Sequence, residues 1–259
     1  MKNTLAVIKI GTNTLTTPDA QLDLNVMRNL VSQMGEAITR GQKLILVTSG
    51  AITCGAQALE FKPKSITEKQ AAAAVGQILL MQQYTQFFGE KGIQVGQILL
   101  TKDCMQDPIR KRNTQNTIST LLEHGAIPII NENDSVATDE IGAKFGDNDE
   151  LSASVAKLVQ ADQLILLTDI DGLYTANPKL DPTATLISDI PVVTPEILAL
   201  VQDTDNGRSR GGMTSKLTCA KDAAQAGITV TLANGRKPEV IRDILIGVSV
   251  GTRVARHDK

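Results

Sequence analysis

Short apolar runs alternate along the chain with longer segments in which apolar residues recur every three or four positions. The short runs are typical of buried β-strands and the longer pattern is typical of amphipathic helices. Strands are predicted at residues 5–10, 43–48, 93–99, 126–130, 163–168 and 228–232. Helices are predicted at residues 22–40, 67–88, 112–124, 150–160, 211–227 and 237–246. This alternation predicts an α/β fold, an open three-layer α/β/α sandwich with a mostly parallel central sheet.

Turn and capping residues mark several of these boundaries. Thr67 with Gln70 predicts a capping box at the start of the alanine-rich helix, and Gly41 and Gly125 are typical helix stops. Residues 169–205 have no clear period, and one or two hairpins on a sheet edge are expected there. No linker or internal repeat divides the sequence, so one domain over residues 1–259 is predicted.

The net charge of −2, with 26 basic and 28 acidic residues, argues against a general nucleic-acid-binding protein. Two Tyr, four Phe and no Trp also leave few side chains to stack on bases. No apolar run reaches the length of a membrane span. Three widely spaced cysteines and two histidines indicate neither a disulfide framework nor a zinc site. We expect a cytoplasmic protein that binds neither nucleic acid nor a membrane.

A cluster of acidic and amide side chains follows the strand predicted at residues 126–130. A solvated surface loop would have this composition, but so would the ligand crevice that open α/β sheets form at the carboxyl ends of their strands. The cluster consists of Asn131, Glu132, Asn133, Asp134, Asp139, Glu140, Asp147, Asn148, Asp149 and Glu150.

Two strand ends near the N-terminus also carry candidate chemistry. Lys9 is either an exposed strand-end lysine or a cation directed into a crevice, and the following Gly11 and Thr12 offer N–H groups to a phosphate. Ser49 and Gly50 form a second strand-to-helix turn. Ser49 is either a helix cap or a hydroxyl donor to a substrate carboxylate. Neither a Walker A loop nor a G-x-G-x-x-G sequence follows the first strand.

Two segments in the second half of the chain complete the set. Thr168 and Asp169 end the most apolar strand there, and the adjacent Asp-Gly pair forms either a tight turn or part of a nucleotide site. Residues 211–216 place glycines and hydroxyls before Lys216 in a first helical turn. A lysine there opposes the helix dipole, which a bound anion would explain.

Cations, glycine turns and an acidic cluster together are consistent with a small-molecule kinase, because phosphoryl transfer needs mainly positioning and charge stabilisation. On this chemistry alone, other ligand-binding α/β proteins stay open as the alternative. Mg²⁺ needs few protein carboxylates. Six segments extend this interpretation: VIKIGTN (7–13), VTSGAI (47–52), RNTQNT with IPIINENDSVA (112–117 and 127–137), FGDNDELSA (145–153), LLTDIDGLYTANP (166–178) and GGMTSKL (211–217). With these segments the chain resembles the amino acid kinase family, and within it the members that phosphorylate the γ-carboxylate of L-glutamate for proline biosynthesis.

The resemblance implies a role for each candidate. Lys9 and Lys216 would bind the ATP phosphates and stabilise the transferred group, and Asp149 would orient both lysines. L-Glutamate would be held by Ser49, Gly50, Asp134, Asp147 and Asn148. ATP would be bound by Lys9, Gly11, Thr168, Asp169, Arg210, Gly211, Gly212, Met213, Thr214, Ser215 and Lys216. Arg210 stands where the family turn usually has threonine, and no residue is implied as a direct Mg²⁺ ligand.

The same resemblance implies MgATP as the second substrate, feedback inhibition by proline, and a homo-oligomer, dimer or tetramer. We expect no C-terminal PUA domain of the kind that many relatives carry. A family member acting on acetylglutamate, aspartate, carbamate or UMP is an alternative, which the INEND and GDND segments disfavour. A non-catalytic sensor of amino acids or nucleotides with this fold is a second alternative, which the presence of both lysines disfavours.

Overall fold

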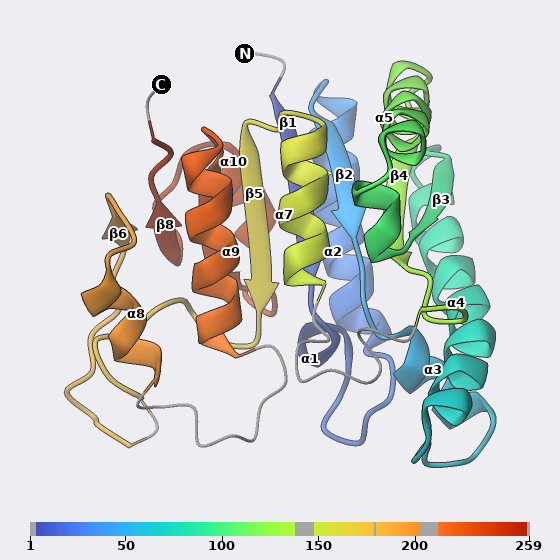
Figure 1. Cartoon of the computed structure of the whole chain (residues 1–259), viewed down its shortest axis with the longest axis horizontal. Helices are drawn as coiled ribbons and strands as arrows, with labels where there is room; N and C mark the ends of the chain where they lie inside the picture. Colours follow the sequence, from blue (N-terminus) through green and yellow to red (C-terminus); the bar gives the residue numbers. More distant parts are fainter. Residues whose placement is uncertain (1–3, 138–147, 179, 203–211, 258–259) are drawn as a thin grey trace.

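The computed structural model describes residues 4–137, 148–178, 180–202 and 212–257. In this part of the chain an eight-stranded sheet has the order β3-β4-β2-β1-β5-β7-β8-β6 (Figure 1). The pair β7–β8 is antiparallel and the other neighbouring pairs are parallel. The strands are β1 (Leu5–Ile10), β2 (Lys43–Val47), β3 (Val95–Leu100), β4 (Ile127–Glu132), β5 (Gln163–Thr168), β6 (Asp189–Ile190), β7 (Thr229–Asn234) and β8 (Thr252–Val254).

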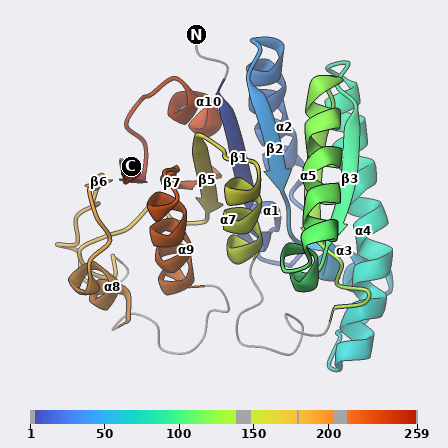
Figure 2. The ribbon, with the colours of Figure 1, turned by 45° about the horizontal axis from the view of Figure 1, so that its top comes forward.

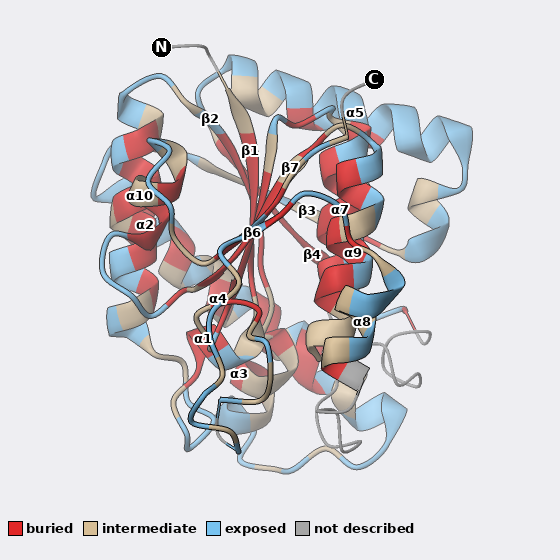
Figure 3. Cartoon of the chain, turned by 90° about the vertical axis from the view of Figure 1, so that its left-hand side faces the viewer, coloured by how far each residue is buried: buried red, intermediate tan, exposed pale blue. Residues whose placement is uncertain are grey.

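Helices cover both faces of this sheet, as the edge-on view shows (Figure 3). One face packs against α2 (Leu24–Thr39), α4 (Ile66–Gly89) and α10 (Val240–Leu245). The other packs against α5 (Pro108–Glu123), α7 (Asp149–Leu158) and α9 (Met213–Gln225). The shorter helices are α1 (Thr12–Leu15), α3 (Ala51–Ala58), the 3₁₀ helix η1 (Lys102–Met105) and α8 (Pro195–Gln202). The predicted three-layer α/β/α architecture is confirmed.

The central strands are apolar on both faces because each face is covered by helices. In β1, Val7 contacts the core below α7 and α9, whereas Ile8 contacts the core below α2 and α4. Both side chains are fully buried. Figure 2 shows β3, α4 and α5 side by side at one end of the sheet, and β6 with α8 at the other.

The six predicted strands are all present, each within two residues at either end. Helix α5 begins at Pro108, four residues before the predicted start at residue 112, because Asp107 caps it and proline is favoured in the first turn. The predicted position of the capping box was wrong by two residues. In the structure the capping box consists of Ser65, whose side chain accepts from the Glu68 N–H, and Glu68 itself.

The described residues between 169 and 202 differ from the expected hairpins. The segment contributes β6, which pairs in parallel with β8, and helix α8. Within the described part of this segment, the antiparallel pairing is one isolated bridge between Tyr174 and Leu186. Neither β6 nor β8 was predicted, since strands of two and three residues are too short to show a period.

The order of the strands determines where a ligand can bind. From β1 the chain passes to β2 on one side, and it later returns to β5 on the other side of β1. In open α/β sheets, the ligand crevice forms at the carboxyl ends of the strands, where the strand order changes direction. Lys9, Thr48, Asn131 and Thr168 all lie at or directly after the carboxyl end of β1, β2, β4 or β5.

Helices α3 and α4 pack closely enough for their backbones to touch. A Cβ atom on Gly76 would lie 1.8 Å from the Ala51 carbonyl oxygen, and one on Gly55 would lie 1.7 Å from that of Ala72. Neither glycine has a positive φ, so the space between the helices requires glycine there. The contact fixes α3, and with it the turn after β2, against α4.

We predict that Gly76→Ala lowers the free energy of unfolding by about 1–3 kcal/mol, since an added atom must separate the helices. Urea denaturation followed by circular dichroism measures the change. Gly89→Ala is the matched control in the same helix, because a Cβ atom on Gly89 meets nothing within 4 Å. Equal stability of the two variants would show that the α3–α4 contact tolerates a methyl group.

Candidate active site

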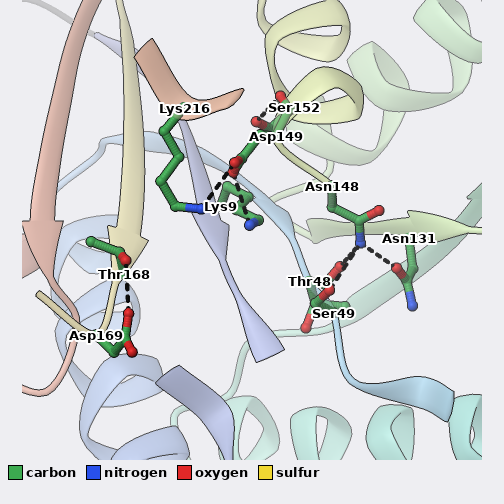
Figure 4. Close-up of polar contacts among 10 residues, drawn as sticks. All are labelled: Lys9, Thr48, Ser49, Asn131, Asn148, Asp149, Ser152, Thr168, Asp169 and Lys216. Carbon is green, nitrogen blue, oxygen red and sulfur yellow. Dashed lines mark hydrogen bonds and ion pairs between the residues drawn. The ribbon is translucent and has the colours of Figure 1, made fainter. Parts of the chain in front are cut away.

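The centre of the candidate site is a carboxylate between two ammonium groups (Figure 4). Asp149 Oδ1 lies 2.8 Å from Lys9 Nζ, and Lys216 Nζ donates to Asp149 Oδ2 at 3.0 Å. Lys9 and Asp149 are fully buried, and Lys216 is 7% exposed. The structure therefore excludes the exposed strand-end interpretation of Lys9. The three residues predicted to be catalytic therefore contact one another in the folded chain.

Each of the three side chains comes from a different element. Lys9 is the second-last residue of β1, Asp149 is the first residue of α7, and Lys216 is the fourth residue of α9. A carboxylate is favoured at a helix N-terminus and a lysine is not. The Asp149 carboxylate therefore has favourable electrostatics on its own helix and offsets the unfavourable position of Lys216.

Gly11 lies beside Lys9, and its small size matters there more than its backbone conformation. Its φ is −75°, which any residue can adopt, but a Cβ atom would lie 3.3 Å from Lys9 Nζ. The Gly11 N–H donates to the Leu167 carbonyl at 3.4 Å. A side chain here would crowd the ammonium group where an anion would approach it.

Asn148, next to Asp149, joins the ends of two further strands. Its side-chain nitrogen donates to the Thr48 carbonyl, to Asn131 Oδ1 at 2.7 Å and to Ser49 Oγ at 3.4 Å. Gly50, and not Ser49, is the residue that precedes α3, and it has a φ of +102°, which favours glycine. Ser49 therefore does not cap the helix, and its hydroxyl lies beside the Asn148 amide.

The remaining predicted substrate residues are placed in part. Asp134 lies half-buried in the turn after β4. Asp147 falls outside the described residues, as do Arg210 and Gly211 of the predicted nucleotide turn. Gly212 precedes α9 without a side-chain cap, and its next three residues are half-buried in the first turn: Met213, Thr214 and Ser215.

Thr168 and Asp169 lie at the carboxyl end of β5. The Thr168 hydroxyl donates to Asp169 Oδ1 at 3.1 Å, and the Asp169 side chain is otherwise exposed. Beyond them, Asp171 accepts from Lys237 at 2.6 Å and from Asn234 at 3.0 Å. The bond from Lys237 holds the pKa of the Asp171 carboxyl below its usual value. These bonds tie the Asp-Gly turn to the loop after β7.

Sequence reasoning missed two polar residues that hold the site together. Thr48 presents its carbonyl to Asn148, and its hydroxyl bonds to Tyr84 at 2.8 Å. Gln77 of α4 accepts from Asn131 Nδ2 at 2.8 Å. Gln77 lies in an alanine-rich helix with no local sign of function. Asn131 belonged to the polar cluster, but its place at a strand end was the only sign of its role.

Among the described residues, no group of three or more His, Cys, Asp or Glu side chains could hold a metal ion. The helices in the same part of the chain include none that is long and apolar enough to cross a membrane.

Comparisons with known proteins identify the family and the fold. Residues 4–234 match the profile described as "Amino acid kinase family". Glutamate 5-kinase of Listeria innocua is 47% identical over 253 residues, covering 96% of this chain and 92% of that protein. Glutamate 5-kinase of Clostridium acetobutylicum is 48% identical over 248 residues, covering 95% and 92%. The product complex of T. acidophilum isopentenyl phosphate kinase shares the fold, with a TM-score of 0.66, 18% identity and coverage of 97% and 100%.

We predict that Asp149→Asn destabilises the chain by about 3 kcal/mol or more, because two buried ammonium groups lose their shared carboxylate. Urea unfolding measures the loss. Glu150→Gln is the neighbouring control. The Glu150 side chain is 61% exposed and lies 3.5 Å from Lys102, and such surface pairs contribute little. If both variants unfold at the same urea concentration, Asp149 does not stabilise the buried lysines.

Proposed function

The chain belongs to the amino acid kinase family, and on that premise we propose that it phosphorylates the γ-carboxylate of L-glutamate with MgATP. The products are L-glutamyl 5-phosphate and ADP, and the reaction begins proline biosynthesis. The names of the relatives that are 47% and 48% identical support glutamate as the acceptor. The observation that supports phosphoryl transfer best is the buried group Lys9–Asp149–Lys216 at the carboxyl ends of the strands.

The two lysines stabilise the charge on the transferred group. A migrating phosphoryl group spreads negative charge over its equatorial oxygens, and fixed ammonium groups compensate that charge without reorganisation. Asp149 keeps the two ammonium groups near each other, with N–O distances of 2.8 and 3.0 Å. Mg²⁺ arrives with the nucleotide as part of the substrate and neutralises charge on the phosphates.

The acceptor needs no general base. A γ-carboxylate is ionised at neutral pH, so one of its oxygens attacks the γ-phosphorus directly. The bond from that phosphorus to the β–γ bridging oxygen breaks, and ADP leaves with the electron pair. Ser49, Gly50 and Asn148 contact the acceptor at the end of β2, and Asp134 and Asp147 contact its α-amino group.

The nucleotide binds on the side of the two lysines that is opposite to the glutamate acceptor. Thr168 and Asp169 contact it from the end of β5. The turn before α9 contacts the phosphates, with Gly11 leaving room for them beside Lys9. The residues assigned to ATP binding here are Arg210, Gly211 and Gly212 before the helix, and Met213, Thr214, Ser215 and Lys216 in the first turn of α9 itself.

Three further properties are proposed. Feedback inhibition by proline and assembly as a homo-oligomer (dimer or tetramer) rest on family resemblance, whereas a cytoplasmic location rests on the three widely spaced cysteines. We also propose that residues 1–259 act as one kinase domain.

The direct test is ADP release by the purified chain with MgATP, in the presence and absence of L-glutamate. Hydroxylamine traps the acyl phosphate as a hydroxamate. Acetylglutamate, aspartate, carbamate and UMP run in parallel as competing acceptors. Glutamate-dependent hydroxamate supports the proposal, and turnover with another acceptor reassigns the substrate. Nucleotide binding without turnover on any acceptor favours the sensor alternative.

If Lys216 stabilises the transferred phosphoryl group, Lys216→Ala lowers kcat by about a hundredfold or more, as for other removed charge-stabilising groups. Steady-state kinetics at saturating glutamate and MgATP measure this loss. Lys221→Ala, on the same helix, is the control and retains its kcat. An unchanged kcat in Lys216→Ala removes that lysine from the mechanism.

If Asp134 binds the α-amino group of the acceptor, Asp134→Ala raises the KM for glutamate by about tenfold or more, the size expected for a lost hydrogen bond to a charged group. The KM for MgATP stays nearly constant. A selective loss of ATP affinity would move Asp134 to the nucleotide side.

A further inference from the structure

Three buried side-chain amides form a chain from α4 to the N-terminus of α7. Gln77 Oε1 accepts from Asn131 Nδ2 at 2.8 Å, and Asn131 Oδ1 accepts from Asn148 Nδ2 at 2.7 Å. The exposed fractions of the three residues are 8%, 2% and 5% in that order. Gln77 is remote from the two lysines in sequence and is not among the residues implied by the resemblance.

Backbone groups of known polarity fix the direction of this chain. The Glu132 N–H donates to Asn131 Oδ1 at 2.9 Å, so that atom must be the amide oxygen. The Thr48 carbonyl accepts from Asn148 Nδ2, so that atom must be the amide nitrogen. Asn131 therefore directs its own nitrogen at α4, where it needs an acceptor, and Gln77 Oε1 is that acceptor.

The orientation of Asn148 has a consequence for substrate binding. Figure 4 shows its amide oxygen turned away from the groups that its nitrogen contacts. That oxygen can accept a hydrogen bond from an ammonium group, but an inverted amide would present a donor instead. The amide direction therefore decides whether this position attracts or repels the α-amino group of an amino acid.

We propose that Gln77 is a positioning residue for the amino-acid substrate, and that it acts by holding Asn131 and, through it, the Asn148 amide in one orientation. This inference rests on the proposed function for the identity of the substrate. Without the Gln77 oxygen, Asn131 Nδ2 loses that acceptor in a buried place, which is unfavourable. Rotation of the Asn131 amide then releases Asn148.

The test compares the KM values for both substrates in Gln77→Leu and Gln77→Met. Leucine lacks an acceptor and methionine has only a weak one. Two variants are made so that the test can still be carried out if one of them does not fold. The KM for glutamate is expected to rise about tenfold, corresponding to one lost hydrogen bond. The KM for MgATP stays within about twofold, because the hydrogen bonds of the amide chain join α4 to the ends of β2 and β4, on the proposed acceptor side.

Tyr84→Phe is the matched structural control. Tyr84 lies seven residues after Gln77 on the same helix and is fully buried. Its hydroxyl bonds to the Thr48 hydroxyl and not to the amide chain. The variant loses a buried hydrogen bond of similar kind, so its stability falls. Its KM for glutamate is expected to stay unchanged. Gln77→Glu keeps an oxygen for Asn131 and is expected to retain a KM near that of the unmodified chain.

Several outcomes overturn the inference. They are an unchanged glutamate KM in folded Gln77→Leu or Gln77→Met, an equal rise for both substrates, or the same selective rise in Tyr84→Phe. If the unmodified chain phosphorylates a different amino acid, the comparison is made with that acceptor. If it phosphorylates none, the proposed function fails, and a crystal structure of Gln77→Met decides. A rotated Asn148 amide supports the inference and an unchanged one overturns it.

Discussion

The ion pairs of Asp149 with Lys9 and Lys216 are the interaction on which the rest of the site depends. Burying an ammonium group is unfavourable unless a carboxylate lies beside it, and here one carboxylate serves two lysines. The three side chains belong to β1, α7 and α9. The sheet must therefore bring both halves of the chain together before either lysine can be buried. The strand order, with β2 and β5 on opposite sides of β1, does so.

The N-terminus of α7 links the two sides of the proposed reaction. Asn148 contacts the ends of β2 and β4, and the next residue, Asp149, contacts the lysines of β1 and α9. Because the two residues are adjacent, a movement of this helix end would displace acceptor and phosphoryl groups together. The rigid contact between α3 and α4, and the amide chain that begins at Gln77, hold the acceptor side against such movement.

Local signals predicted the long elements well, because periods of apolar residues are repeated several times within them. They failed where an element is short or where its boundary depends on a cap. The two- and three-residue strands β6 and β8 are stabilised by pairing with residues far away in sequence, so no local pattern reveals them. The capping box of α4 was placed two residues late, because Ser65 and Glu68 form it in place of Thr67 and Gln70.

The sequence by itself determined the layered α/β fold, the strand ends that carry Lys9, Ser49 and Thr168, and a glycine turn before Lys216. Motif resemblance further assigned Asp149 to the lysines. The tertiary structure decided that Lys9 is buried. It also decided that the Asn148 side chain contacts the Ser49 hydroxyl, and that Gln77 of α4 hydrogen-bonds to Asn131. Burial and hydrogen-bond direction depend on contacts between distant segments, and only the folded chain specifies those contacts.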